Sequence, residues 1–302
     1  MKHVAVLMGG WSAEREVSMD SGLACTEALR SCGYKVTPVD VGRDISQTLA
    51  EVRPDVCFNA LHGRYGEDGY IQGLLEIMGI PYTHSGVLAS ALAMDKPVAK
   101  KLFAMADMTC AEGKIFTRKE IMDGASYPKP FVIKPLNEGS SVGVTIMLEG
   151  ENINLSDLPW TFGEQVMIET YIPGREIQVA VMGDTALGAV EIKPLGRFYD
   201  YEAKYTSGKA EHLMPAPLSP ENYSEALRLG LLAHQTLGCR GVSRSDFRFD
   251  DTGAGEGKFY ILETNTQPGM TALSLVPEIA GHSGMAFEEL VRWIVEDASC
   301  DR

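Results

Sequence analysis

Several familiar signatures are missing from this sequence of 302 residues, and each absence excludes a class of function. There is no G-x-x-x-x-G-K motif followed by Ser or Thr, so any ATP is bound by a device other than a P-loop. No G-x-G-x-x-G motif follows the first predicted strand, which weakens a dinucleotide-binding interpretation. Apolar runs stay well short of the roughly 20 residues that a membrane-spanning helix needs.

Cationic residues are scarce relative to acidic ones. The chain has 27 Lys and Arg against 41 Asp and Glu, a formal net charge of −14. Binding to nucleic acids and anionic membranes depends on an excess of Lys and Arg, so we expect neither as a partner. Apolar residues make up 45% of the chain, which is enough for the cores of two or three packed units.

The six cysteines form no C-x-x-C pair, and most lie in apolar patterns. Such cysteines are typical of reduced core thiols in a cytoplasmic protein. The N-terminal run MKHVAVLMGG is too short for a signal peptide and lacks a small-residue cleavage pattern. We therefore expect a cytoplasmic protein whose chain opens with a strand.

The first ninety or so residues alternate between strand-like and helix-like segments. Strands are predicted at 4–8, 35–41, 55–61 and 81–83, and helices at 13–32 and 68–78. This alternation predicts a parallel sheet with helices on its faces. Because ligands of such sheets collect at the carboxyl ends of the strands, Glu14 and His62 are expected at one rim.

The remaining two thirds are mostly β in character. A helical segment at 87–106 contains Pro97, which predicts a kink or two successive helices. Strands at 131–134 and 144–148 flank a polar loop and predict a β-hairpin. Further strands at 166–170 and after Arg175 precede a helix at 219–236 and two acidic strands.

The two acidic strands carry the most informative pattern. Residues two apart on a strand point to the same face, so Glu263 and Asn265 can place their oxygen atoms at one point. On the upstream strand Arg244 and Asp246 share a face, and antiparallel pairing would bring Asp246 beside Glu263. Two carboxylates and a carboxamide are typical of Mg²⁺, which completes its shell with waters and substrate phosphates.

The loop EGSSVG, at 138–143, follows a strand that ends in Lys134. Its glycine amides and serine hydroxyls beside that lysine offer several donors to phosphate oxygens. The loop also matches G-x-S-x-G, the nucleophile elbow of a serine hydrolase, but that elbow needs a helix immediately after the serine. The residues that follow favour a strand, so a phosphate-binding loop is preferred over a hydrolase or a hairpin tip without function.

Two further features admit both a functional and a structural interpretation. The run FYDYEAKY, at 198–205, is either a loop that covers a substrate or an ordered surface loop. Glu14 lies near the start of a predicted helix, where it either complements the helix dipole or binds a substrate amino group.

Together these segments resemble the D-alanine–D-alanine ligases, members of the ATP-grasp superfamily. The matching segments span nearly the whole chain in family order: GGWSAEREVS (9–18), ALHGRYGEDGYIQG (60–73), SALAMDK (90–96), VIKPLNEGSSVGV (132–144), FYDYEAKY (198–205), SRSDF (243–247) and LETNTQPGMTALSLVP (262–277). The resemblance implies an α/β fold: a Rossmann-like substrate domain at 1–95, a central ATP-grasp subdomain at 96–176, and a C-terminal ATP-grasp subdomain at 177–302 that carries the metal and D-alanine sites.

The resemblance also implies a reaction and its participants. ATP and two D-alanine molecules would give D-alanyl-D-alanine, ADP and phosphate through a D-alanyl phosphate and a tetrahedral intermediate, for peptidoglycan precursor synthesis. Two Mg²⁺ or Mn²⁺ ions would bridge the phosphates, and the protein would be a homodimer. Because an acyl phosphate hydrolyses readily, the loops at 138–143 and 198–210 are expected to be mobile without ligand and to close over it.

Matching positions imply roles for individual residues. The metal ligands would be Asp246, Glu263 and Asn265. ATP would be bound by Lys96, Lys134, Glu138, Ser140, Ser141, Glu169, Glu176, Lys204 and Asn265. The D-alanines and the reacting atoms would contact Glu14, His62, Ser140, Lys204, Tyr205, Arg244, Gly269, Ser274 and Leu275. Thr170 stands where a basic residue is often found in the family, which leaves the adenine contact there open.

The roles at the two amino acids differ. Glu14 would bind the ammonium of the first D-alanine, with Ser140 and Tyr205 linking it to the closing loops. His62 would lie near that D-alanine's carboxylate and Lys204 near the transferred phosphate. The tetrahedral oxyanion would be stabilised by Arg244 and the backbone of Gly269. The carboxylate of the second D-alanine would be bound by Ser274 and Leu275.

Two alternatives remain within this superfamily. One is a ligase that joins D-alanine to D-lactate, or another ATP-grasp carboxylate–amine ligase; the YEAKY context of Tyr205 argues against the D-lactate enzyme. The other is a catalytically silent ATP-binding module, which the intact metal ligands, Lys134 and Arg244 make unfavourable.

Overall fold

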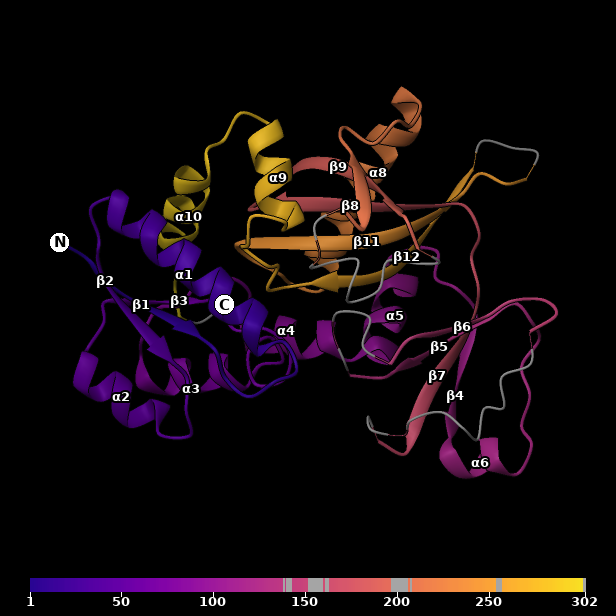
Figure 1. Ribbon diagram of the computed structural model, residues 1–302, viewed down its shortest axis with the longest axis horizontal. Coiled ribbons are helices and arrows are strands. Elements are labelled where there is room, and N and C mark those ends of the chain that lie inside the picture. The colour runs from indigo at the N-terminus through magenta and orange to yellow at the C-terminus, as the bar shows by residue number, and fades with distance from the viewer. Residues whose placement is uncertain are drawn as a thin grey trace.

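The computed structural model describes residues 1–137, 139, 143–151, 160, 163–196, 206, 208–253 and 257–300. Within these residues the chain forms three β-sheets in succession, each accompanied by helices (Figure 1). The indigo N-terminal sheet and the orange C-terminal sheet lie side by side, and the magenta sheet lies at the far end of the molecule (Figure 1).

The N-terminal sheet is parallel, as the alternating pattern predicted. It consists of β1 (His3–Met8), β2 (Lys35–Asp40) and β3 (Val56–Asn59) in the order β2-β1-β3. Its helices are α1 (Arg15–Ser31), α2 (Ile45–Val52) and α3 (Tyr70–Met78). The strand expected at 81–83 is reduced to isolated bridges that Tyr82 makes with Cys57 and Ser299.

Strand β1 is buried on both faces, which explains its unbroken apolar run. Val4 and Val6 belong to a core shared with α1 and with the C-terminal helix α10 (Phe287–Glu296). Ala5 and Leu7 belong to the opposite core, with α2 and α3. The end of the chain therefore returns to cover the first sheet (Figure 1).

Two helices lead from this sheet to the next, α4 (Val87–Met94) and α5 (Lys96–Met105). They confirm the interruption that Pro97 predicted. Pro97 lies in the first turn of α5, and the side chain of Asp95 caps that helix by accepting a hydrogen bond from the backbone N–H of Val98 at 3.0 Å.

The second sheet is antiparallel in the order β4-β7-β5-β6. Its strands are β4 (Gly113–Thr117), β5 (Phe131–Pro135), β6 (Thr145–Met147) and β7 (Gln165–Thr170). A short helix, α6 (Arg118–Met122), follows β4. The predicted hairpin is confirmed, because β5 pairs with β6.

The third sheet is also antiparallel, in the order β10-β9-β8-β11-β12. Its strands are β8 (Arg175–Met182), β9 (Thr185–Pro194), β10 (Ala210–Leu213), β11 (Val242–Asp250) and β12 (Lys258–Asn265). Its two faces are covered by α8 (Pro220–Thr236) and α9 (Leu275–His282), which belong to different cores.

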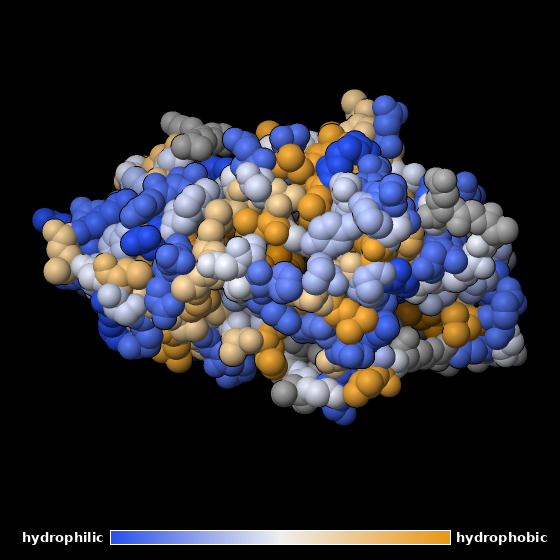
Figure 2. All heavy atoms as spheres, turned by 90° about the horizontal axis from the view of Figure 1, so that it is seen from above, coloured by the Kyte–Doolittle hydropathy of each residue, from blue (hydrophilic) through white to orange (hydrophobic). Residues whose placement is uncertain are grey.

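The surface of the molecule is mixed in polarity. In the view from above, hydrophilic side chains are interspersed with small groups of hydrophobic ones (Figure 2). Among the described residues, no helix combines the length and hydrophobicity needed to cross a membrane.

Candidate active site

Strands β11 and β12 pair as the sequence predicted. Asp246 lies opposite Glu263, and Arg244 lies opposite Asn265, with a register irregularity just beyond Asp246. Asp246 is 4% exposed, and the side chain of Glu263 is 28% exposed. The strand pairing therefore places two carboxylates and a carboxamide at adjoining positions near the end of β12.

Both carboxylates have cationic neighbours, as buried acids require. The guanidinium of Arg244 donates from Nε and Nη2 to Asp246 at 2.7 and 2.9 Å. Lys96 Nζ lies 3.4 Å from Glu263 Oε2. Asn265 Oδ1 accepts the backbone N–H of Gln267 at 2.7 Å, which starts the turn that follows β12.

A first cavity joins these strands to the rim of the N-terminal sheet. Nine predicted residues line it: Glu14, His62, Lys96, Arg244, Glu263, Asn265, Gly269, Ser274 and Leu275. They come from both ends of the chain, so only the folded protein brings them together.

Glu14 lies just before α1 and is 6% exposed. Its backbone N–H donates to Ser12 Oγ at 3.2 Å, and Ser12 Oγ donates to the carbonyl of His62 at 2.7 Å. The carboxylate approaches Gly63, where a Cβ would lie 2.7 Å from Glu14 Oε2. Gly63 also has φ +67°, so only a glycine here readily permits both this turn and the close approach of the Glu14 carboxylate.

His62 is buried at 5% exposure, and its Nε2 lies 3.2 Å from Ser21 Oγ. The same hydroxyl accepts the backbone N–H of Met270 at 3.2 Å. Burial lowers the pKa of His62 to about 4. The imidazole is therefore neutral near pH 7, and it links the N-terminal rim to the turn after β12.

Glu67 is a lining residue that the sequence interpretation missed. It is 7% exposed and accepts the backbone N–H of Gly63 at 3.0 Å. Burial first, and then the nearby Glu14, raise the pKa of Glu67 well above its ordinary value. It lies in the segment 60–73, but nothing there distinguishes it from the adjacent Asp68.

The second amino acid is expected at the turn between β12 and α9. Ser274 stabilises this turn, because its Oγ accepts the backbone N–H of Thr271 at 2.9 Å. A Cβ on Gly269 would lie 2.7 Å from Ser274 Oγ, so the turn is tightly packed. Leu275 is the first residue of α9, whose N-terminus is suited to an anionic group.

A second cavity lies between the second and third sheets and meets the first at Lys96 and Glu263, which line both. It is also lined by the predicted residues Lys134, Glu169, Glu176 and Asp246. Apolar residues, including Val132, Ile146 and Leu262, complete its walls. Its lining combines an apolar wall with many charged side chains, which suits a small molecule that has both an apolar part and a charged part.

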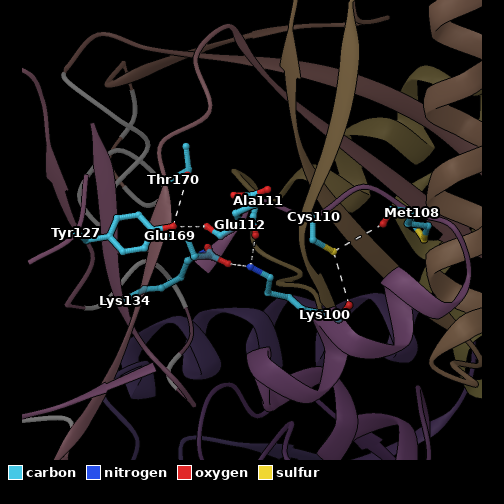
Figure 3. Close-up of polar contacts among 9 residues, drawn as sticks. All are labelled: Lys100, Met108, Cys110, Ala111, Glu112, Tyr127, Lys134, Glu169 and Thr170. Carbon is cyan, nitrogen blue, oxygen red and sulfur yellow. Dashed lines mark hydrogen bonds and ion pairs between the residues drawn. The ribbon is translucent and has the colours of Figure 1, made fainter. Parts of the chain in front are cut away.

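Glu169 lines one side of this second cavity and makes several polar contacts there (Figure 3). Its carboxylate, 4% exposed, forms ion pairs with Lys134 and with Lys100 of α5. Lys100 was not among the predicted residues. Glu176 lies on the neighbouring sheet, where it accepts from Gln178 Nε2 at 3.2 Å and faces Arg248 at 3.9 Å.

Five predicted residues lie outside the described part of the chain: Glu138, Ser140, Ser141, Lys204 and Tyr205. Most residues of the loops at 138–143 and 198–210 also lie outside the described part of the chain, so the expected motion of these loops stays a prediction. The residues that follow the first loop form β6 rather than a helix, which removes the context that a hydrolase elbow requires.

Two family models match the chain. A model described as D-ala D-ala ligase C-terminus matches residues 99–296, and one described as D-ala D-ala ligase N-terminus matches residues 43–85. A protein of Parvibaculum lavamentivorans named D-alanine–D-alanine ligase is 56% identical over 304 residues, covering 100% of this chain and 99% of that protein.

Solved structures agree with this match. A D-alanine–D-alanine ligase from Bacillus anthracis superimposes with a TM-score of 0.83 at 31% identity, over 98% of this chain and 97% of that one. A structure of the ligase from the same organism complexed with ATP gives a TM-score of 0.82 at 28% identity, with the same coverage. The three sheets thus form a Rossmann-like unit followed by an ATP-grasp fold, and the chain belongs to the D-alanine–D-alanine ligase family.

Proposed function

We propose that the protein joins two molecules of D-alanine, with ATP as the energy source, to give D-alanyl-D-alanine, ADP and phosphate for peptidoglycan precursors. One observation carries the proposal: Glu263, which lies opposite Asp246, lines both the second cavity with its lysines and the first cavity with Glu14 and Arg244. This arrangement suits the transfer of a phosphoryl group from a nucleotide in one cavity to an amino acid in the other.

Mg²⁺ ions fit the donors at the junction. Among the described residues, no three His, Cys, Asp or Glu side chains gather into a metal cage. Asp246, Glu263 and Asn265 instead offer a few hard oxygen donors, which is the usual share of the protein when phosphates supply the rest. When bound there, Mg²⁺ neutralises the charge that moves with the phosphoryl group.

In the second cavity, called the nucleotide cavity from here on, the chain's own residues bind and orient ATP. Lys134 and Lys96 provide cations for the phosphates, and Glu169 and Glu176 provide acceptors at the base and ribose end. The assigned roles of Glu138, Ser141 and Lys204 stay predictions, because these residues lie outside the described part of the chain.

In the first half-reaction, an oxygen of the first D-alanine's carboxylate attacks the γ-phosphorus of ATP, and ADP leaves. Glu14 is placed to bind the ammonium group of that D-alanine, because its buried carboxylate lines the first cavity. His62, neutral at physiological pH, is placed to hydrogen-bond the carboxylate without adding charge. The carboxylate becomes a D-alanyl phosphate, whose phosphate is a good leaving group.

In the second half-reaction, the amine of the second D-alanine attacks the carbonyl carbon of the D-alanyl phosphate. Arg244 and the backbone N–H of Gly269 line the cavity and are placed to stabilise the oxyanion that forms. Ser274 and the N-terminus of α9 are placed to bind the second D-alanine's carboxylate. Collapse expels phosphate, the nitrogen loses a proton, and the dipeptide remains.

Three further proposals accompany this one. The division into 1–95, 96–176 and 177–302 is supported by the sheets, since β1–β3 fall within the first range, β4–β7 within the second and β9–β12 within the third. Strand β8 starts at Arg175, two residues before the third range. Ser140 and Tyr205 remain the predicted links between Glu14 and the closing loops. A homodimer in the cytoplasm remains a prediction.

The proposal is tested by ATP-dependent phosphate release with D-alanine alone, with L-alanine alone, and with D-alanine plus D-lactate. We expect release with D-alanine and D-alanyl-D-alanine as the product, no release with L-alanine, and no depsipeptide with D-lactate. Absence of release with D-alanine would reject the proposal. Depsipeptide as the main product would favour the D-lactate alternative.

A further inference from the structure

Lys100 reaches from helix α5 into the wall of the nucleotide cavity. Its Nζ forms an ion pair with Glu169 Oε1 and donates to the backbone carbonyl of Ala111 at 2.6 Å (Figure 3). Its side chain is 16% exposed, so the ammonium is largely withdrawn from water. A buried lysine beside a buried carboxylate is a strong interaction whose loss leaves an uncompensated charge.

The two oxygens of Glu169 are divided between two lysines. Lys100 contacts Oε1, and Lys134 contacts Oε2. An ionised carboxylate has about four lone-pair sites, so both oxygens keep the capacity to accept a further hydrogen bond. Lys134 and Glu169 line the cavity directly, whereas Lys100 stands behind Glu169 and is not among the lining residues.

Thr170 takes no part in this ion pair. Consecutive residues on a strand point to opposite faces, so Thr170 of β7 points away from the Glu169 side chain. Its hydroxyl lies 3.3 Å from the hydroxyl of Tyr127, which donates to the carbonyl of Glu112 at 3.1 Å (Figure 3). The cations next to the Glu169 carboxylate are therefore Lys100 of α5 and Lys134 of β5, and position 170 supplies none.

The Glu169 carboxylate interacts differently with adenine and with guanine. A carboxylate accepts hydrogen bonds and donates none. The six-position of adenine carries an amino group that donates, whereas that of guanine carries a carbonyl oxygen that only accepts. A charged Glu169 at the base end of the cavity thus favours adenine and repels guanine.

The inference rests on the proposed binding of ATP. If Lys134 turns toward the phosphates, it leaves Glu169 Oε2, and Lys100 becomes the main cation that keeps this buried carboxylate charged and oriented. We propose that Lys100 is a positioning residue that holds Glu169 as an acceptor for the amino group of adenine, and so sets the preference of the cavity for ATP over GTP.

Binding measurements on the full-length protein test this role. Dissociation constants for ATP and for GTP are measured by calorimetry with Mg²⁺ and without D-alanine, for wild type, Lys100→Met, Lys100→Arg and Lys101→Met. Lys101 is the matched control, because it is the next residue on α5 and is exposed. Lys100→Met is expected to weaken ATP binding by about tenfold to a hundredfold, the usual effect of losing a hydrogen bond to a charged group, with little change for GTP.

The other variants sharpen the result. Lys100→Arg is expected to retain most of the preference for ATP, because it keeps the positive charge beside Glu169. Lys101→Met is expected to match wild type. In turnover assays, Lys100→Met should raise the KM for ATP and leave the KM for D-alanine unchanged, a split that a general loss of structure does not produce.

Three outcomes would overturn the inference. One is an unchanged ratio of ATP to GTP affinity in Lys100→Met. Another is an equal loss for both nucleotides accompanied by a lower melting temperature, which makes Lys100 purely structural. The third is an effect of Lys101→Met as large as that of Lys100→Met. Failure of the proposed ligase activity would appear separately, as wild type that binds ATP but releases no phosphate with D-alanine.

Discussion

Asp246 on β11 lies directly opposite Glu263 on β12, at the point where the first and second cavities meet. Arg244 binds Asp246 and Lys96 lies near Glu263, so each acid has a cation from outside the pair. These are the charges that the proposed function assigns to a metal-bound phosphate.

Replacing Glu263 by glutamine should abolish turnover while the fold is kept. The change removes a proposed metal-ligating charge but no core contact, and we expect phosphate release to fall by about a hundredfold or more. The melting temperature should stay close to that of wild type. Asp250→Asn is the control, because Asp250 shares the face of Asp246 but lies at the far end of β11. Near-normal activity of Glu263→Gln would show that the metal assignment is wrong.

The buried pair Asn59 and Gln267 ties the N-terminal sheet to the turn after β12. Asn59 Nδ2 donates to Gln267 Oε1 at 3.0 Å, and Gln267 Nε2 donates to the carbonyl of Asn59 at 2.5 Å. Gln267→Ala should lower the free energy of unfolding by about 2–4 kcal/mol, because the buried carbonyl of Asn59 loses this donor and its side-chain NH2 group keeps only the hydrogen bond to the carbonyl of Gly66.

The same substitution should raise the KM for D-alanine, since the turn that carries Gly269 and Ser274 loses its attachment. Urea denaturation and phosphate release measure the two effects. Gln235→Ala, which truncates an exposed glutamine on α8, should change neither. Equal behaviour of Gln267→Ala and Gln235→Ala would contradict the structural role of the pair.

Three buried histidines should make the protein less stable in acid. Burial lowers the pKa of His62 and His234 to about 4 and that of His84 to about 3. Unfolded histidine titrates near about 6.5, so between that pH and about 4 the unfolded state binds more protons. The free energy of unfolding should therefore decrease as the pH falls through this window.

Each histidine contributes a slope of at most about 1.4 kcal/mol per pH unit. Urea denaturation at a series of pH values measures the total slope. His234→Gln tests one contribution, because His234 lies on α8 and hydrogen-bonds Ser243 Oγ at 2.7 Å, away from the proposed reaction. As the pH falls, the free energy of unfolding of the variant should decrease less steeply than that of wild type. An identical slope would show that His234 is not buried in its neutral form.

Two helical glycines should respond oppositely to alanine. A Cβ on Gly230 of α8 would lie 2.5 Å from Val179 Cγ1 on β8, so Gly230→Ala should cost about 1–3 kcal/mol of stability by overpacking. A Cβ on Gly73 of α3 meets nothing within 4 Å, so Gly73→Ala should stabilise by about 0.4–1 kcal/mol. Thermal unfolding of both variants checks the signs, and destabilisation of similar size in both would refute the packing argument.

Much of the local structure was predictable from short-range patterns. The break between α4 and α5 follows from Pro97, because a proline inside a helix removes a hydrogen bond and clashes with the preceding turn. The adjacency of the two acidic strands follows from their alternating side chains and closeness in the sequence, whereas the exact pairing of Asp246 with Glu263 depends on a register irregularity beside Asp246. The strand at 81–83 was predicted as a full element, but Tyr82 forms only isolated bridges.

Other features could not be predicted from local patterns. Lys100 has the spacing of an ordinary surface lysine on a helix, and only the approach of α5 to β7 brings it to Glu169. Glu67 is one of two adjacent acids, and only the fold buries it beside Glu14. The packing of α10 against α1 joins the two ends of the chain, which no periodicity reveals.

By itself the sequence determined most of the strands, the helices near 13–32, 68–78, 87–106 and 219–236, the parallel first sheet, the acidic strand pair and the family, since these depend on side-chain alternation, turn residues and motifs read along the chain. The tertiary structure alone decided which charges far apart along the chain meet. It placed Lys96 near Glu263 and Lys100 on Glu169. The physical reason is that the strength of an ion pair depends on separation and burial in space, and neither is encoded in distance along the chain.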